Sequence, residues 1–255
     1  MSNSSLVNYT KISPNRTSPR RHKIDTITIH HMAGNLSVQE CGQVFASSAA
    51  QASANYGVDS KGKIGLYVPE SDRSWASSSP DNDHRAITIE VANSTLSPDW
   101  KVSDTAYKAL IKLLVDICKR NKIKELKWTG NPNETDINKQ NMTVHRWFAP
   151  TLCPGPYLFS KMGQIAKDVN KELGVVSTTK PVTETTKPVS SEFKVKVTAT
   201  VLNYRSGPGV SYQINGTLKK GEVYTITKIE YNGSTKWGKL KSGAGWISLQ
   251  YTEKI

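Results

Sequence analysis

Four side chains that could bind a metal or transfer a proton stand in three short, similar parts of the sequence. His30 and Glu90 each close a run of alternating apolar and polar residues, His145 closes a third, and Cys153 follows eight residues later. Two imidazoles and a thiolate suit zinc, which takes nitrogen and sulfur ligands at about 2.0 to 2.3 Å and can leave one position open. A nearby carboxylate could then act as general base for a water acidified by the metal.

The alternation predicts where these groups point. Isoleucine or valine occupies every second position in 26–30 and in 87–91, which is typical of half-buried strands. His30 and Glu90 therefore lie on the polar face of their strands, and His145 has the same parity in its segment. From spacing alone, the histidines could equally be packed or surface residues. A zinc site is thus one of two interpretations at this point.

Helical spacing of apolar residues predicts three helices around these strands. Ser37 and Glu40 form a capping-box pattern that opens the first, which we expect to continue through the alanines near 49–54. The second covers about 103–121 and the third about 156–173. Strands interleaved with helices indicate an α/β or α+β domain with a central mixed sheet and flanking helices.

The composition divides the chain into two domains. Residues 175–192, VVSTTKPVTETTKPVSSE, are rich in Thr, Pro, Ser and Lys and are typical of an extended linker. We therefore expect the first domain to span 1–174. Residues 193–255 contain short alternating runs separated by glycine-rich turns, without helical spacing, which predicts a small all-β barrel.

The charge indicates an anionic partner. The chain holds 34 Lys and Arg against 21 Asp and Glu, a net charge of +13. Residues 1–174 carry +6 (22 basic, 16 acidic), the linker carries none (two of each), and residues 193–255 carry +7 (ten basic, three acidic). Nucleic acid is the commonest anionic partner, but the sequence has no recognition-helix or zinc-finger pattern. We expect no nucleic-acid binding.

Membrane insertion and secretion are also not expected. No stretch approaches the roughly 18 consecutive apolar residues of a membrane span. The first 23 residues lack the apolar core of about 7 to 15 residues that a secretory signal peptide needs. The sequence therefore predicts a chain made in the cytoplasm without a signal peptide.

Three segments carry a resemblance to a known family: ITIHHMAG (27–34), ITIEVAN (87–93) and HRWFAPTLCPGPYL (145–158). Over residues 12 to about 170 the chain resembles the type 2 N-acetylmuramoyl-L-alanine amidases, a zinc family that includes phage lysozyme-type amidases and peptidoglycan recognition proteins. The resemblance implies that His30, His145 and Cys153 hold Zn²⁺. It also implies that Glu90 is the catalytic carboxylate, as in the endolysin and autolysin branch.

Two positions depart from the family's pattern. Relatives often carry lysine two residues before the cysteine, where it helps to polarise the scissile carbonyl; here the residue is Thr151, a hydroxyl that can donate one hydrogen bond. Some relatives carry a tyrosine where this chain has Ala54. Both differences place more of the acid and base chemistry on Glu90 and the metal, with Thr151 expected as a weaker contributor to catalysis.

Three further residues are candidate substrate contacts. Asn55 and Trp75 lie in segments that border the substrate groove in similar enzymes, and His84 lies in a loop that could rim the cleft. Trp75 could equally be a core residue, and His84 a solvated one. The remaining candidates look structural: His31 has core-facing parity, and Cys41 and Cys118 are expected to be inert core thiols rather than ligands or disulfide partners.

Residues 193–255 resemble the bacterial SH3-like domains of cell-wall proteins. LNYRSGPG, GTLKKGE, WGKLK and GWISLQY occur in the expected order. The resemblance implies binding to peptidoglycan or the surrounding wall, and the charge of +7 suits anionic wall polymers.

Together, the two resemblances predict a phage endolysin, or a similar autolysin, that hydrolyses the amide between N-acetylmuramic acid and L-alanine in Gram-positive walls. Such a lysin would reach the wall only after release from the cytoplasm. The alternative is a non-catalytic peptidoglycan recognition protein. Proteins of that kind typically lose the cysteine ligand, whereas this sequence retains Cys153. The sequence predicts no particular oligomeric state.

Overall fold

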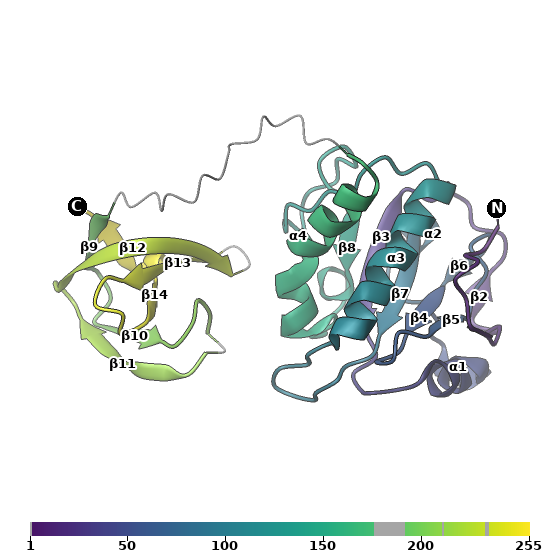
Figure 1. Ribbon diagram of the computed structural model, residues 1–255, viewed down its shortest axis with the longest axis horizontal. Helices are drawn as coiled ribbons and strands as arrows, with labels where there is room; N and C mark the ends of the chain where they lie inside the picture. The colour runs from purple at the N-terminus through teal and green to yellow at the C-terminus, as the bar shows by residue number, and fades with distance from the viewer. Residues whose placement is uncertain (1, 176–191, 211, 233–234) are drawn as a thin grey trace. The chain divides into compact units, whose positions relative to one another are not determined.

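The computed structural model describes residues 2–175, 192–210, 212–232 and 235–255 (Figure 1). The chain forms two compact units, Met1–Val176 and Ser177–Ile255. The predicted linker, 175–192, lies outside the described residues except at its two ends. In the part of the chain that the structure describes, no helix has both the length and the apolar character needed to cross a membrane.

A six-stranded mixed sheet forms the centre of the first unit. β3 pairs in parallel with β7 on one side and β8 on the other, β4 pairs in parallel with β7, and β4 pairs antiparallel with β5. The strand order is β1 (Tyr9–Thr10), β5 (Ile64–Leu66), β4 (Tyr56–Val58), β7 (Ala86–Val91), β3 (Thr26–His31) and β8 (Met142–Val144). A separate antiparallel pair joins β2 (Arg16–Thr17) to β6 (Arg73–Ser74).

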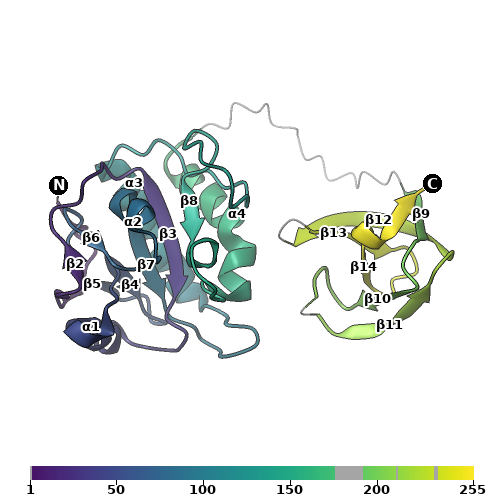
Figure 2. The same ribbon diagram turned by 180° about the vertical axis from the view of Figure 1, so that it is seen from behind.

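Two long helices cover one face of this sheet, α3 (Asp104–Arg120) and α4 (Gly155–Glu172), and they pack together with the sheet (Figure 1). The isoleucines of β3 and β7 face these helices and are fully buried with them. The view from behind shows β3 and β7 on the side away from α3 and α4, with α1 (Val38–Ala46) at the edge of the sheet (Figure 2). The unit also contains α2 (Pro80–Arg85) and the 3₁₀ turns Ser48–Ala50 and His145–Trp147.

The structure confirms the helices predicted over 103–121 and 156–173, with Ser103 capping the amino end of α3. The capping box of Ser37 and Glu40 is also present. The predicted extent of that first helix is wrong, because α1 ends at Ala46 rather than continuing through the alanines near 49–54. Ser47 has an extended backbone (φ −79°, ψ 125°). The Asn15 side-chain amide donates to the Ser47 carbonyl at 2.8 Å, and this bond replaces the backbone hydrogen bond that a continuing helix would supply.

The second unit is all-β, as predicted. Seven strands among its described residues form one antiparallel sheet in the order β11 (Ile214–Lys219), β10 (Val201–Arg205), β14 (Trp246–Ser248), β13 (Thr235–Leu240), β12 (Val223–Asn232), β9 (Phe193–Val197) and β15 (Thr252–Lys254). A small apolar core lies inside, made by Val195, Val197, Leu202, Leu218, Ile226, Leu240 and Ile247. The fold class is therefore a mixed α/β domain with a separate all-β unit.

A buried ion pair stabilises the first unit near the end of α3. The Glu70 carboxylate is fully buried and accepts two hydrogen bonds from the Arg120 guanidinium, at 2.7 and 2.8 Å. It also accepts one from the Tyr56 hydroxyl at 2.6 Å and one from the Asn121 amide at 3.0 Å. These donors compensate a charge that would otherwise be costly to bury.

We expect Arg120→Ala to lower the free energy of unfolding of the first unit by about 3 to 5 kcal/mol, because it leaves the Glu70 charge buried without its partner. The matched control is Arg85→Ala. Arg85 pairs with Asp25 at 3.0 Å, but their side chains are 35% and 15% exposed, so we expect a loss of about 1 kcal/mol or less. Urea unfolding of the full chain compares the two variants. Equal losses would contradict this assignment.

Candidate active site

Strand register places the three candidate residues of the sheet side by side. In the parallel pairing of β3 with β7, His30 lies directly opposite Glu90. On the other side of β3, Ile29 pairs with Val144, the last residue of β8, so His145 follows at the next position. Since parallel strands end at the same edge of a sheet, the three side chains meet there. His145 itself begins a 3₁₀ turn rather than extending the strand.

Cys153 reaches this edge from the turn that precedes α4. Its Sγ lies 3.4 Å from His30 Nδ1, and its carbonyl accepts a hydrogen bond from the Arg146 N–H at 3.2 Å. The turn requires glycine at position 155, where φ is +80°. A Cβ at Gly155 would also lie 3.1 Å from His31 Nδ1. The Cys-Pro-Gly sequence therefore fixes the position of the thiol beside His30.

The ligand atoms of His30, His145 and Cys153 all lie within 4.8 Å of one another. Tetrahedral zinc with the usual bond lengths places its ligand atoms roughly 3.3 to 3.8 Å apart. The Cys153–His30 distance of 3.4 Å already fits, and the widest separation has to close by about 1 Å. Two nitrogen donors and one sulfur donor suit this metal, which would take its fourth ligand from outside these three residues.

The electrostatic state of these groups also suits a cation. Burial, followed by the nearby His145 and His31, lowers the pKa of His30 to about 3, so this imidazole is neutral and its lone pair can bind a metal. Burial raises the pKa of the Cys153 thiol above its usual range. Because a divalent cation favours the thiolate, it would compensate the cost that burial imposes.

Glu90 lies beside the ligands and faces the same edge. Its Oε1 is 3.9 Å from His30 Nδ1, and its side chain is 16% exposed, which leaves it accessible to a substrate. Desolvation by its neighbours raises the pKa of Glu90 to about 8. Glu90 Oε2 and His30 Nε2 are buried and have no hydrogen-bond partner among the described residues. The carboxylate therefore has free acceptor capacity beside the candidate ligands.

Thr151 is engaged within the turn that holds Cys153. Its hydroxyl oxygen accepts a hydrogen bond from the Cys153 N–H at 3.2 Å, while the Thr151 N–H donates to the Ala149 carbonyl at 2.8 Å. This contact gives Thr151 a structural function in positioning the thiol. The hydroxyl proton remains able to donate, so its contribution to catalysis stays a prediction.

The structure does not bring two of the three candidate substrate contacts, Asn55 and His84, to this edge. Asn55 is fully buried, and its Oδ1 accepts from the Thr88 N–H at 3.1 Å, so it cross-links the interior. Trp75 is half-buried, and its indole N–H donates to the Thr17 hydroxyl at 3.0 Å. His84 lies in α2, ahead of the first residue of β7, and accepts from the Arg21 N–H at 3.0 Å. It therefore stands at the opposite end of the strand from Glu90.

The residues expected to be structural are packed. His31 is half-buried and meets the Trp100 ring edge-on, with 5.1 Å between centroids. Cys41 and Cys118 are buried, and burial raises the pKa of each thiol to about 12, which keeps both protonated. Ala54 is fully buried in the cluster with Cys41.

Sequence reasoning missed Ser78. Its hydroxyl lies 3.3 Å from His145 Nε2. Ser78 is the middle residue of three consecutive serines, 77–79, in a segment without periodicity, so no sequence signal separates it from its neighbours.

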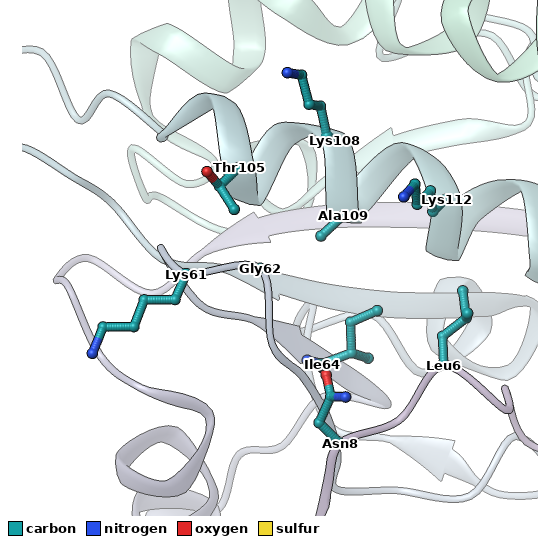
Figure 3. A pocket seen from close by; sticks show the side chains of 9 residues that line it. All are labelled: Leu6, Asn8, Lys61, Gly62, Ile64, Thr105, Lys108, Ala109 and Lys112. Carbon is teal, nitrogen blue, oxygen red and sulfur yellow. Dashed lines mark hydrogen bonds between the residues drawn. The ribbon is translucent and has the colours of Figure 1, made fainter.

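A cavity of about 380 Å³ lies elsewhere on the first unit, between α3 and the residues around β5 (Figure 3). Lys61, Lys108 and Lys112 stand around it, with Ile64 and Ala109 facing each other across the space. It lies on the side of the sheet that α3 covers. None of the candidate site residues lines it.

Comparison with known proteins identifies the family. Residues 20–156, more than half of the chain, match the family model described as N-acetylmuramoyl-L-alanine amidase. The chain belongs to this amidase family. Family membership supports peptidoglycan amidase activity, and the matched range contains all four residues gathered at the sheet edge. A comparison of this chain with curated proteins found no match.

Solved structures similar to the amidase include PlyL, with 16% identity and a TM-score of 0.48. The match covers 64% of this chain and 96% of the PlyL chain. The catalytic domain of XlyA has 16% identity and a TM-score of 0.48, with coverage of 64% and 99%. The endolysin amidase LysCS from Clostridium intestinale has 18% identity and a TM-score of 0.45, with coverage of 64% and 93%.

Proposed function

We propose that this amidase is a zinc-dependent endolysin that hydrolyses the amide bond between N-acetylmuramic acid and L-alanine in Gram-positive cell walls. The proposal rests mainly on one observation: His30, His145 and Cys153 hold three metal-capable atoms within 4.8 Å, at the sheet edge where Glu90 is also found. Such a phage lysin would act on the wall after its release from the cytoplasm.

The side chains divide the chemistry between them. Zinc held by His30, His145 and Cys153 would supply Lewis acidity, polarising the scissile carbonyl and acidifying a water molecule. Glu90 would accept the proton of the attacking water and later deliver it to the leaving amine of L-alanine. The Thr151 hydroxyl would donate one hydrogen bond to the oxyanion.

Analysis of the products tests this function. Purified protein incubated with Gram-positive walls should release new amino termini that begin with L-alanine, and removal of the metal with a chelator should abolish their release. A catalytically inert wall-recognition protein would bind the walls without producing any new termini. Reducing sugar ends in place of amino termini would show that a glycosidic bond is cut and would exclude the amidase.

We further propose that residues 193–255 are a bacterial SH3-like domain that binds the cell wall. The unit has its own core and an antiparallel sheet. It carries +7 of the net charge of +13. This balance suits anionic wall polymers, with peptidoglycan peptides as the other candidate ligand.

Removing residues 175–255 should weaken attachment to walls more than it slows cleavage of a small soluble muropeptide. The sheet edge with Glu90 and the three candidate ligands lies entirely in the first unit, so chemistry on a freely diffusing substrate does not need the second. Cosedimentation with walls and muropeptide turnover measure the two effects on the same preparation. An equal loss in both assays would contradict this division of labour.

A further inference from the structure

The segment between β6 and α2 places one serine against a candidate metal ligand. Ser78 Oγ lies 3.3 Å from His145 Nε2. Ser78 has φ +64°, in the left-handed region that costs a serine conformational energy and that glycine would occupy freely. A residue held in such a conformation needs support from its surroundings, and this often occurs at functional sites.

That support comes from Asp83, whose carboxylate is buried in α2. Its Oδ2 accepts hydrogen bonds from the Ala76 N–H at 3.0 Å and the Ser77 N–H at 3.1 Å, and its Oδ1 accepts one from the Ser77 hydroxyl at 2.6 Å. After Ser78, the Ser79 hydroxyl caps α2. The backbone is therefore fixed on both sides of Ser78, which is itself exposed and directs its hydroxyl to His145.

Asn82, the residue before Asp83 in α2, connects this loop to the strands of the site. The Asn82 amide donates to the Thr28 hydroxyl of β3 at 3.0 Å, and its oxygen accepts from the Thr143 hydroxyl of β8 at 2.9 Å. β3 carries His30, and β8 leads directly into His145. Asn82 thus holds the Ser78 loop at a fixed position relative to both histidines.

We propose that Ser78 is a positioning residue for the metal site, which orients His145 and selects its tautomer. The inference rests on the proposed function, because it assumes that His145 binds zinc. The Ser78 oxygen accepts the proton of His145 Nε2, which leaves the Nδ1 lone pair for the metal. Metal-binding histidines commonly hold their second ring nitrogen in this way, and loss of the partner typically weakens metal affinity by about 10- to 100-fold.

Two substitutions separate the hydroxyl from the backbone conformation. Ser78→Ala removes the hydroxyl and retains the strain of a Cβ at positive φ, whereas Ser78→Gly removes both. The matched control is Ser160→Ala, an exposed serine of α4 whose hydroxyl donates to the Tyr157 carbonyl at 2.7 Å and contacts none of the candidate ligands. Zinc affinity of the full chain is measured by competition with a chromophoric chelator, and melting temperature is measured on the metal-free protein.

We expect both Ser78 variants to bind zinc about 10-fold or more weakly, while Ser160→Ala binds it like the wild type. The metal-free Ser78→Gly protein should melt no lower than the wild type, so that weaker zinc binding cannot be attributed to a damaged fold. If wild-type protein binds zinc and both Ser78 variants bind it within twofold as tightly, this inference is wrong while the proposed function stands. Wild-type protein that binds no zinc would overturn both.

Discussion

Glu90→Gln is expected to lower the rate of amide hydrolysis by about 10² to 10⁴, the range that a general base contributes, while zinc content and wall binding stay unchanged. Glutamine has nearly the same shape but cannot accept a proton from the attacking water. Glu90 lies opposite His30 in the strand register and retains an unpartnered buried oxygen, so the substitution does not break a hydrogen bond that stabilises the fold. Turnover of walls and of a soluble muropeptide measures the effect.

The control for this substitution is Glu172→Gln, which changes an exposed carboxylate at the end of α4. It has the same chemistry and the same change in net charge, and we expect activity like that of the wild type. If Glu90→Gln retained more than about a tenth of wild-type turnover, Glu90 would not be the base. If it lost zinc together with activity, Glu90 would be acting through the metal site and not on the substrate.

Cys153→Ala should abolish stoichiometric zinc binding and, with it, wall hydrolysis. The substitution removes one of three candidate ligands, and the thiol lies 3.4 Å from His30 Nδ1. We expect a loss of zinc affinity larger than the roughly 10- to 100-fold effect of changing a group that only supports a ligand. Metal analysis after dialysis and turnover of walls measure the two losses.

The chain contains its own controls for this change. Cys41 and Cys118 are also buried thiols, but neither belongs to the group of metal-capable residues. Cys118→Ala should cost on the order of 1 kcal/mol of stability through the small cavity it leaves, and the variant should still bind one zinc per chain. Zinc binding that survived in Cys153→Ala, or that was lost equally in Cys118→Ala, would contradict the assigned ligands.

The strands that carry the site could be predicted because the alternation of apolar and polar residues that defines them lies within each short segment. Alternating isoleucines specify which face of a strand is buried, and this parity placed His30 and Glu90 on the same side of the sheet. The parallel register that sets them side by side is consistent with that parity. The spacing from His145 to Cys153 was informative because the Cys-Pro-Gly turn fixes the chain before α4 begins.

Features that depend on distant contacts could not be predicted in this way. Asn55 is polar and lies in a segment expected to border a groove. In the structure it is completely buried, and its side chain accepts a hydrogen bond from Thr88 of β7. The alanines after α1 favour a helix locally. The side-chain amide of Asn15, about 30 residues earlier, instead donates a hydrogen bond to the carbonyl of Ser47, where α1 ends. Ser78 acquires its position only from the fold, through Asp83 and the loop that it holds.

X-ray absorption at the zinc edge tests the central claim most directly, because it reports the atoms bound to the metal in the full chain. For zinc held by His30, His145 and Cys153 we expect two imidazole nitrogens at about 2.0 to 2.1 Å, one sulfur at about 2.3 Å and one further light atom. The sulfur contribution should disappear in Cys153→Ala. A zinc environment without sulfur in the wild-type protein, or one with two or more sulfurs, would contradict the site described above.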